Sequence, residues 1–384
     1  MRKSIFLIFL LLMTGCSVYD LHTLASAAVS KNPSKVIKGF IKQKSEYYAT
    51  HPHALIKDVK IFLKKFNLEL KNFQKAISLW KNPSKPGTKT IVKYSQHYKA
   101  RAFINFEKGY VRVETISKDF IRALEIALVN TMLMPQDPRS VDLFSDKIEL
   151  NGEPFLAGEI YDFENRPVLY KWRAKRYAKW LIKHRLKKYI VQNQTVYYVT
   201  FDLSKNSETV RVKKYLPYVK EFSSKYSVSK VLILAVIKTE SDFNPYAVSY
   251  VPAFGLMQIV PVTAGVEGFE RAYGYKKIPD RDFLFVPKNN INIGSAYLNL
   301  IFYKYLKKIK NPINREYCAI CAYNSGIGNV LKVFSSRRDR AYYVINNLTP
   351  AEVYKRLTLR LPTKEGRNYL PKVLKHKKLF IGIK

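Results

Sequence analysis

The spacing of hydrophobic positions changes near residue 206 and divides the chain into two parts. From residue 66 to residue 205, runs of helical period are mixed with runs in which apolar and polar residues alternate, and alternation is typical of half-buried strands. We predict strands at 100–106 and 110–116, one or two strands at 189–202, a helix at 117–131 that Ser117 can cap, and a helix at 168–186. Residues 107–109, Glu-Lys-Gly, supply the turn between the first two strands. This part is expected to fold as an α+β domain.

In the second part of the chain the hydrophobic positions follow the helical period, and no strand signal of any strength appears. We predict helices at 210–226, 229–240, 258–265, 288–308, 315–323, 326–334, 350–358 and 364–378. In the second of these helices residues 231–237 are apolar on every side, so it should be buried all round. Ser229 can cap its N-terminus, and Asn244 should end it because a residue before proline is disfavoured in the α region. This part is expected to be an all-α domain.

A single acidic residue, Glu240, lies at the C-terminal end of the apolar helix. Desolvation disfavours a carboxylate there, and the negative end of the helix dipole repels it, so both effects are expected to raise the pKa of the carboxyl group. A carboxyl group that stays protonated near neutral pH is what a general acid requires. An isolated glutamate near a helix end is more often an exposed residue, so the assignment depends on the motifs that follow.

Three short motifs occur in a fixed order from this position. They are Glu-Ser-x-Phe-Asn-Pro-Tyr-Ala-Val-Ser at 240–249, Gly-Leu-Met-Gln at 255–258 and Ala-Tyr-Asn at 322–324. In this order they resemble the motifs of lytic murein transglycosylases of the lysozyme-like superfamily, and most closely those of the membrane-bound lytic murein transglycosylase C family. The same resemblance extends through Phe-Leu-Phe-x-Pro at 283–287, Leu-Lys-Val-Phe-Ser at 331–335 and Tyr-Leu-x-Lys-Val at 369–373. One motif alone would be weak, but three in order with matching flanks are specific.

The resemblance implies a fold and a reaction. Residues 206–384 would form a lysozyme-like all-α catalytic domain, preceded by an α+β accessory domain over residues 66–205. The loop at 137–143 resembles the family as well. The implied enzyme cleaves the β-1,4 bond between N-acetylmuramic acid and N-acetylglucosamine in peptidoglycan, without consuming water, and leaves 1,6-anhydromuramoyl ends. It would be a lyase that acts in cell-wall turnover or remodelling, and the family implies no cofactor and no metal.

The resemblance also implies site residues at matching motif positions. Glu240 would be the general acid and then the base that acts on the C6 hydroxyl of the same sugar. The implied substrate-binding residues are Ser249, Met257, Gln258, Tyr323, Asn324 and Tyr369. Met257 is equally well explained as a core residue. Val251 departs from the family, in which a second serine often stands at that position.

Only one of the acids in this region belongs to a motif. Glycosidic cleavage normally takes two carboxylates, whereas Asp242, Glu267, Glu270 and Asp280 have no motif context. A nucleophile that is part of the substrate gains from effective molarity, which can offset the missing enzyme nucleophile. A lysozyme-type hydrolase with the same acid remains an alternative, and so does a non-catalytic wall-binding lipoprotein, although an intact Glu240 with both partner motifs favours an enzyme.

The N-terminus has the pattern of an export signal. Residues 1–15 join a charged start to an apolar core that is too short to cross a bilayer as a mature helix. Met-Thr-Gly-Cys at 13–16 resembles a lipobox, which implies cleavage before Cys16 and acylation of this cysteine. A plain secretory signal with an incidental cysteine is the alternative. Because Ser17 stands where aspartate would imply retention at the inner membrane, we expect the periplasmic face of the outer membrane, with residues 16–65 as a helical tether.

The formal charge of +38 would suggest a nucleic acid partner in a cytosolic protein. An exported chain does not meet nucleic acid, so the expected anionic partners are peptidoglycan carboxylates, lipid head groups and lipopolysaccharide phosphates. The basic stretch at 168–186 could bind such anions, and a solvated basic face explains it at least as well. Cys318 and Cys321 lie inside an apolar helical run, so we expect small buried residues rather than a metal or redox site. The sequence indicates neither the oligomeric state nor an endolytic or exolytic preference.

Overall fold

The computed structural model describes residues 78–82, 84, 87–137, 152–249 and 253–383. The chain divides into two compact units, of which the first comprises Met1–Val210 with Ser249–Pro252 and the second Arg211–Val248 with Ala253–Lys384. The export signal, Cys16, the tether and Val251 lie outside the described residues, as does nearly all of the 137–143 loop. What the sequence says of them stays a prediction.

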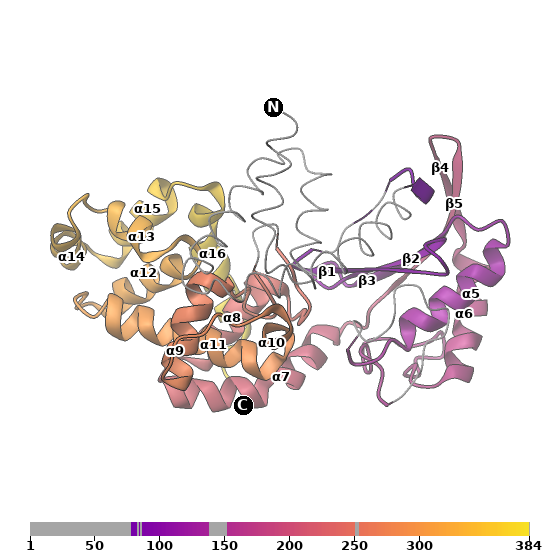
Figure 1. Cartoon of the computed structure of the whole chain (residues 1–384), viewed down its shortest axis with the longest axis horizontal. Helices are drawn as coiled ribbons and strands as arrows, with labels where there is room; N and C mark the ends of the chain where they lie inside the picture. Colours follow the sequence, from indigo (N-terminus) through magenta and orange to yellow (C-terminus); the bar gives the residue numbers. More distant parts are fainter. Residues whose placement is uncertain (1–77, 83, 85–86, 138–151, 250–252, 384) are drawn as a thin grey trace, which may run out of the picture. The chain divides into compact units, whose positions relative to one another are not determined.

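The first unit contains a five-stranded antiparallel sheet with the strand order β1-β2-β3-β5-β4 (Figure 1). The strands are β1 Thr90–Ser95, β2 Ala100–Asn105, β3 Tyr110–Thr115, β4 Lys187–Val191 and β5 Gln194–Asp202. The turn between β2 and β3 is tight because Gly109 adopts a positive φ of 65°, which glycine tolerates without steric cost. The predicted strands are confirmed, and the stretch at 189–202 forms two strands joined by a short turn.

Two helices of this unit, α5 (Phe120–Met132) and α6 (Lys171–Arg185), pack against each other, and they also pack against strands of the sheet (Figure 1). Both were predicted from the helical spacing of their apolar residues. The start of α5 differs from the prediction, because Asp119 rather than Ser117 is the N-cap and accepts a hydrogen bond from the Arg122 amide.

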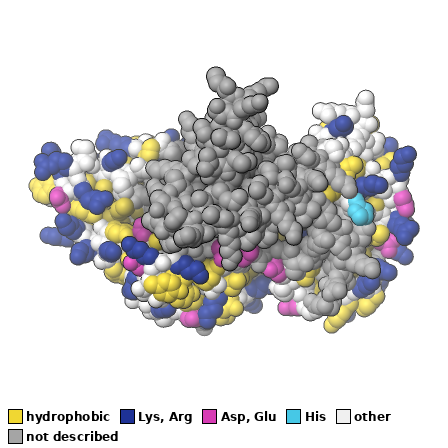
Figure 2. All heavy atoms as spheres, in the orientation of Figure 1, with side chains coloured by type: hydrophobic (Ala, Val, Ile, Leu, Met, Phe, Trp, Pro, Cys, Tyr) yellow, Lys and Arg dark blue, Asp and Glu magenta, His cyan; other side chains and the backbone are white. Residues whose placement is uncertain are grey.

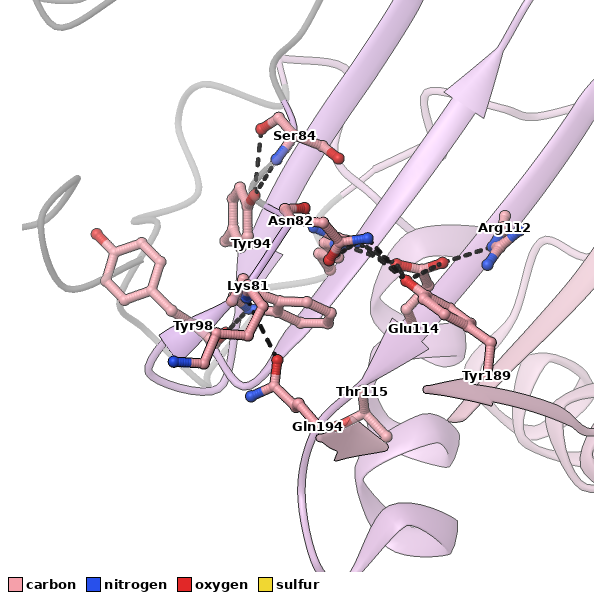
Figure 3. Close-up of polar contacts among 12 residues, drawn as sticks. Lys81, Asn82, Ser84, Tyr94, Tyr98, Arg112, Glu114, Thr115, Tyr189 and Gln194 are labelled. Atoms are coloured by element: carbon pink, nitrogen blue, oxygen red, sulfur yellow. Dashed lines mark hydrogen bonds and ion pairs between the residues drawn. The ribbon is translucent and has the colours of Figure 1, made fainter. Parts of the chain in front are cut away.

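The sheet buries an ion pair between neighbouring strands (Figure 3). Arg101 of β2 and Glu114 of β3 are register partners, their charged groups lie 2.7 Å apart, and both side chains are 2% exposed. The Arg101 guanidinium also lies 3.9 Å from the centroid of the Trp80 ring and donates to the Asn82 carbonyl at 2.7 Å. Arg112 contacts the other carboxylate oxygen of Glu114. These charges are tolerated inside the unit because opposite charges and hydrogen bonds replace the lost water.

The second unit is helical (Figure 1). Its helices are α7 Ser207–Tyr226, α8 Lys230–Ser241, α9 Val266–Tyr273, α10 Arg281–Phe285, α11 Pro287–Asn299, α12 Pro312–Ser325, α13 Ile327–Lys332, α14 Arg338–Asn346, α15 Pro350–Arg360 and α16 Lys364–Leu379, with π-helical turns η1 Pro261–Gly265 and η2 Leu300–Tyr305. Helices α9, α10 and α14 were not predicted. The described helices include none long and apolar enough to cross a membrane.

Helix α8 is the buried centre of the second unit. Every residue from 232 to 237 is buried, as the continuous apolar run predicted. The helix ends at Ser241, one residue beyond the predicted range of 229–240, and Asp242 rather than Asn244 interrupts it, with a left-handed conformation of φ 51° and ψ 41°. Asn244 instead stabilises the loop that follows, where its side-chain oxygen accepts a hydrogen bond from the Tyr246 amide at 3.1 Å.

Candidate active site

Glu240 lies in the last turn of α8 and is half-buried. The next residue, Ser241, is fully buried and donates hydrogen bonds to the carbonyls of Ile237 at 3.1 Å and Leu256 at 2.7 Å. The second of these bonds joins the end of α8 to the loop that contains the Gly-Leu-Met-Gln motif. The position of Glu240 is therefore fixed by both the helix and the loop.

Tyr369 of α16 contacts the carboxyl group of Glu240. Its hydroxyl donates a hydrogen bond of 2.5 Å to Glu240 Oε1, although the two residues are 129 positions apart in the sequence. Burial, followed by the charge of Glu240, raises the pKa of Tyr369 well above its ordinary value. The phenol therefore keeps its proton and remains a hydrogen-bond donor at neutral pH.

Tyr323 of α12 belongs to the same group of side chains. Burial, followed by the charge of Glu240, raises the pKa of Tyr323 well above its ordinary value. Its hydroxyl donates to the carbonyl of Met257 at 2.8 Å, and its ring lies 5.8 Å from that of Tyr297. Tyr323 therefore connects α12 to the motif loop and lies close enough to Glu240 for the charge of that carboxylate to act on it.

The motif loop is held tightly by one buried asparagine. The side chain of Asn290 donates to the carbonyls of Phe254 and Leu284, both at 2.8 Å, and accepts from the Met257 amide at 2.8 Å. Gly255 adopts a φ of 72°, and a Cβ atom there would lie 2.4 Å from the Asn290 amide nitrogen. Only glycine fits this approach, because any side chain would clash with the asparagine and strain the backbone.

The side chain of Gln258 has one oxygen without a hydrogen-bond partner in the described structure. Its amide nitrogen donates to the carbonyls of Ala247 at 3.1 Å and Gly255 at 2.9 Å, which fixes the orientation of the side chain. The side-chain oxygen is buried and has no partner within the described structure. A buried acceptor without a partner costs roughly 1–3 kcal/mol, so this oxygen is a candidate for a bond to a ligand.

The remaining residues implied by the resemblance have other surroundings. Asn324 is half-buried and donates to Glu365 Oε1 at 3.2 Å. The side chain of Met257 is fully buried against Gly294, so its backbone carbonyl, rather than its thioether, is the group joined to Tyr323. Ser249 is half-buried in the loop after α8.

Asn290 and the pairing of Thr239 with His376 did not emerge from the sequence. The Thr239 hydroxyl lies 2.8 Å from His376 Nδ1 and donates to the Ala235 carbonyl at 2.7 Å. Two contacts therefore connect α8 to α16, one from Thr239 to His376 and one from Glu240 to Tyr369. Buried polar groups are almost always hydrogen-bonded, but α11 contains several polar residues, among them Asn289, Asn292 and Asn299, so the sequence does not single out Asn290.

Cys318 and Cys321 are free and buried in α12. Burial raises the pKa of the Cys321 thiol to about 12, which disfavours the thiolate that metal binding and redox chemistry require. Among the residues that the structure describes there is also no group of His, Cys, Asp and Glu side chains placed to hold a metal ion. The prediction that both cysteines are small buried residues is confirmed.

Comparison with known proteins decides the family. The N-terminal domain of membrane-bound lytic murein transglycosylase C matches residues 56–214, and the transglycosylase SLT domain matches residues 217–346. Membrane-bound lytic murein transglycosylase C of Serratia proteamaculans is 45% identical over 290 residues, which are 75% of this chain and 81% of the relative. The enzyme of the same name from Klebsiella pneumoniae is also 45% identical, over 75% of this chain and 80% of its own. The chain belongs to the membrane-bound lytic murein transglycosylase C family.

Family membership confirms the resemblance seen in the sequence. Two solved structures also match in part. The first is an inactive mutant of the lytic transglycosylase Slt of Pseudomonas aeruginosa, which is 25% identical with a TM-score of 0.34, and the match covers 43% of this chain and 24% of that one. The second is the 70 kDa soluble lytic transglycosylase of Escherichia coli, which is 26% identical with a TM-score of 0.33, and the match covers 44% of this chain and 24% of that one. Glu240, Gln258 and Tyr323 lie within the residues matched by the SLT domain, whereas Tyr369 lies beyond them.

Tyr369→Phe isolates the hydrogen bond to Glu240. Hydrogen bonds to charged groups contribute about 1.5–3 kcal/mol, so we expect kcat on peptidoglycan to fall roughly 10- to 100-fold, with KM little changed. Tyr342→Phe is the matched control, because it also removes a buried tyrosine hydroxyl, which donates to the Tyr305 carbonyl at 2.6 Å away from Glu240. If both variants lose activity equally, the effect of Tyr369 is structural and the residue does not act on Glu240.

Proposed function

We propose that this enzyme is a lytic transglycosylase that cleaves the β-1,4 bond between N-acetylmuramic acid and N-acetylglucosamine in peptidoglycan. Family membership supports the class of reaction. The observation that carries the assignment of the acid is the 2.5 Å hydrogen bond from Tyr369 to Glu240 at the end of a buried helix. Residues 206–384 would form the lysozyme-like catalytic domain and residues 66–205 the accessory domain.

Glu240 acts first as the general acid. Because Tyr369 keeps its proton and donates to Oε1, Oε1 has the role of the carbonyl oxygen in this proposal and Oε2 carries the acid proton. Oε2 then delivers this proton to the glycosidic oxygen as the bond from that oxygen to C1 breaks. The carboxylate that remains is stabilised by Tyr369, because a hydrogen bond to a charged acceptor is stronger than one to a neutral acceptor.

Glu240 then acts as the base. Its carboxylate removes the proton of the C6 hydroxyl of the N-acetylmuramic acid, whose oxygen bonds to C1 and closes the 1,6-anhydro ring. The carboxyl group is protonated again and no water is consumed. The nucleophile is part of the substrate, so the high effective molarity of an intramolecular reaction replaces a nucleophile from the enzyme.

Three of the four other acids named in the sequence are engaged elsewhere. Asp242 is buried and pairs with Lys238 at 3.0 Å, and Glu267 accepts a hydrogen bond from Tyr305 at 2.6 Å. Asp280 caps α10 through its side chain. These contacts support a single-carboxylate reaction, because each of these side chains already has a structural role.

The polar groups at the motif positions suit an N-acetylated sugar. In this proposal the unpartnered Gln258 oxygen accepts the N–H of an acetamido group, which would supply its missing hydrogen bond. Ser249 and Asn324 would add polar contacts to the sugar, as their motif positions imply, and Tyr323 would keep the Met257 backbone in place beneath the substrate. In this proposal Met257 contributes its backbone rather than its side chain.

The mass of the products tests this proposal against a lysozyme-type hydrolase. Purified peptidoglycan is digested with the enzyme and the fragments are weighed by mass spectrometry. A transglycosylase gives muropeptides one water lighter than those with a reducing end, and these lighter products are the expected result. Products with reducing ends would show hydrolysis, and an undigested glycan would show a binding protein.

We place the enzyme at the periplasmic face of the outer membrane, anchored through acylated Cys16. The lipobox-like stretch at 13–16 and Ser17 support this location, and the related enzymes are named membrane-bound. Incorporation of labelled palmitate tests the anchor. We expect labelling of the wild-type chain and none of Cys16→Ala, and a Cys16→Ala chain that still takes up label would place the anchor elsewhere.

A further inference from the structure

A basic surface on the first unit has no part in the proposed reaction. Helix α6 reads Lys-Trp-Arg-Ala-Lys-Arg-Tyr-Ala-Lys-Trp-Leu-Ile-Lys-His-Arg and contains no acidic residue. We call the cations of α6 and of the start of β4 the α6 surface: Lys171, Arg173, Lys175, Arg176, Lys179, Lys183, Arg185, Lys187 and Lys188. All of them are exposed except Arg173, which is half-buried. Figure 2 shows that Lys and Arg side chains are spread over much of the described surface, so the α6 surface needs features beyond charge to be a site.

The α6 surface keeps most of its charge unneutralised. In the described part of the chain its ion pairs involve only Arg173, which lies 2.6 Å from Asp162, and Arg176, which contacts Glu164. The remaining seven cations point into solvent on one helix and the strand that follows it. Such a concentration of one sign attracts anions over a distance of about 10 Å at 0.1 M salt.

Large apolar side chains accompany these cations. Tyr170 is 63% exposed, Trp172 is 56% exposed, and Ile190 on β4 is 69% exposed. Exposed tryptophan and tyrosine next to lysine and arginine are typical of surfaces that lie at the interface between a membrane and water. Charge alone would not explain why apolar rings remain in solvent at this place.

The rings are poorly arranged for stacking on sugars. Trp180 stacks on Phe163 with centroids 5.3 Å apart and on His184 with centroids 4.6 Å apart. The guanidinium of Arg173 lies 4.5 Å from the centroid of Trp172. A sugar stacks on the open face of an aromatic ring, and here side chains of the protein lie against faces of Trp172 and Trp180. The geometry therefore favours a lipid surface over a glycan strand as the partner.

We propose that the α6 surface binds the anionic head groups of a phospholipid membrane. The seven unpaired cations lie against the phosphates, and Trp172 and Tyr170 enter the interface between head groups and acyl chains. This binding requires neither the catalytic carboxyl group nor the acyl chain on Cys16. It would hold the first unit of the enzyme on the membrane in addition to the proposed anchor on Cys16.

Sedimentation with vesicles tests the proposal. The mature chain carries Cys16→Ser in every sample, so that no acyl chain contributes, and the vesicles contain phosphatidylglycerol and phosphatidylethanolamine or phosphatidylcholine alone. The test variant is Lys175→Gln/Lys179→Gln/Lys183→Gln, and the control variant Lys332→Gln/Lys355→Gln/Lys378→Gln removes the same charge from exposed positions of the second unit. Each lysine near an anionic surface contributes about fivefold, so we expect the test variant to bind roughly 100-fold more weakly and the control less than threefold.

Tryptophan fluorescence gives a second measurement on the same samples. The chain has three tryptophans, Trp80, Trp172 and Trp180, and Trp80 is fully buried. Brominated lipids should quench the wild-type emission, and Trp172→Phe, which leaves the charge unchanged, should lose most of that quenching.

Four outcomes would overturn the proposal. Equal weakening of the test and control variants would show that only net charge matters. A test variant that binds vesicles normally but is lost from purified sacculi would make cell-wall carboxylates the partner. Failure of the unmodified surface to bind phosphatidylglycerol vesicles, or binding that does not fall with salt, would remove the membrane altogether.

Discussion

Glu240→Gln is expected to abolish nearly all lytic activity while the chain stays folded. Glutamine keeps the shape of the side chain, and its oxygen can still accept the hydrogen bond from Tyr369. The amide has no acid proton to give to the glycosidic oxygen and cannot serve as the base afterwards. Loss of a general acid or base typically costs about 100- to 10,000-fold in rate, and here one group has both roles. Turnover of soluble glycan strands, followed by mass spectrometry, measures the effect.

Glu270→Gln provides the matched control for this experiment. It makes the same chemical change at an exposed glutamate of α9, which the single-carboxylate reaction does not use. We expect kcat to stay within about twofold of the wild-type value. A folded Glu240→Gln enzyme with normal turnover would refute the assignment of the acid, and a large loss in Glu270→Gln would indicate a second carboxylate.

The sequence predicted those parts of the fold that depend on periodicity. The alternating strands, the two helices of the first unit and the buried helix α8 follow from the spacing of apolar residues, which determines the face that each element can bury. Helix α10 was not predicted because its five residues are too few to show a helical period. Helix α14 was not predicted because it begins with Arg-Asp-Arg, a sequence that is also typical of a polar loop. The end of α8 was predicted to within one residue, but Asn244 was taken as the residue that interrupts the helix, because a left-handed aspartate is not a strong sequence signal, whereas a following proline is.

The candidate site shows the same division between local and long-range information. Glu240 stands out through its position after a continuous apolar run, and Gln258 and Tyr323 are found through motif positions. Hydrogen bonds between distant residues have no periodic signal in the sequence. The structure was therefore needed to find three features: the unpartnered side-chain oxygen of Gln258, the hydrogen bonds by which Asn290 holds the motif loop, and the contact of Tyr369 with Glu240. For Tyr369, the resemblance indicated that the residue belongs to the site but not which atom it contacts.

The ion pair inside the sheet leads to the second large expected effect. Arg101→Met leaves the Glu114 carboxylate at 2% exposure without its buried partner, and also removes the cation above the Trp80 ring. Breaking a buried pair on one side typically costs about 3–5 kcal/mol, because a desolvated charge remains. We expect the free energy of unfolding of the first unit to fall by about that amount in urea. All three tryptophans lie in this unit, so their fluorescence reports its unfolding in the full-length chain.

The double variant Arg101→Met/Glu114→Leu distinguishes two contributions to stability. One is the destabilisation caused by an unpaired buried charge, and the other is the net stabilisation from the intact ion pair. If desolvation nearly cancels the attraction, replacing both charges by apolar side chains restores much of the stability that Arg101→Met loses. Lys89→Gln is the surface control, since its ion pair with Glu107 is partly exposed at 23% and 58%, and exposed pairs contribute about 0–1 kcal/mol. A loss in Arg101→Met no larger than that of Lys89→Gln would mean that the Arg112 contact alone satisfies Glu114. A double variant as unstable as the single one would instead assign the stability to the cation–π and Asn82 contacts of Arg101, because these are lost in both variants.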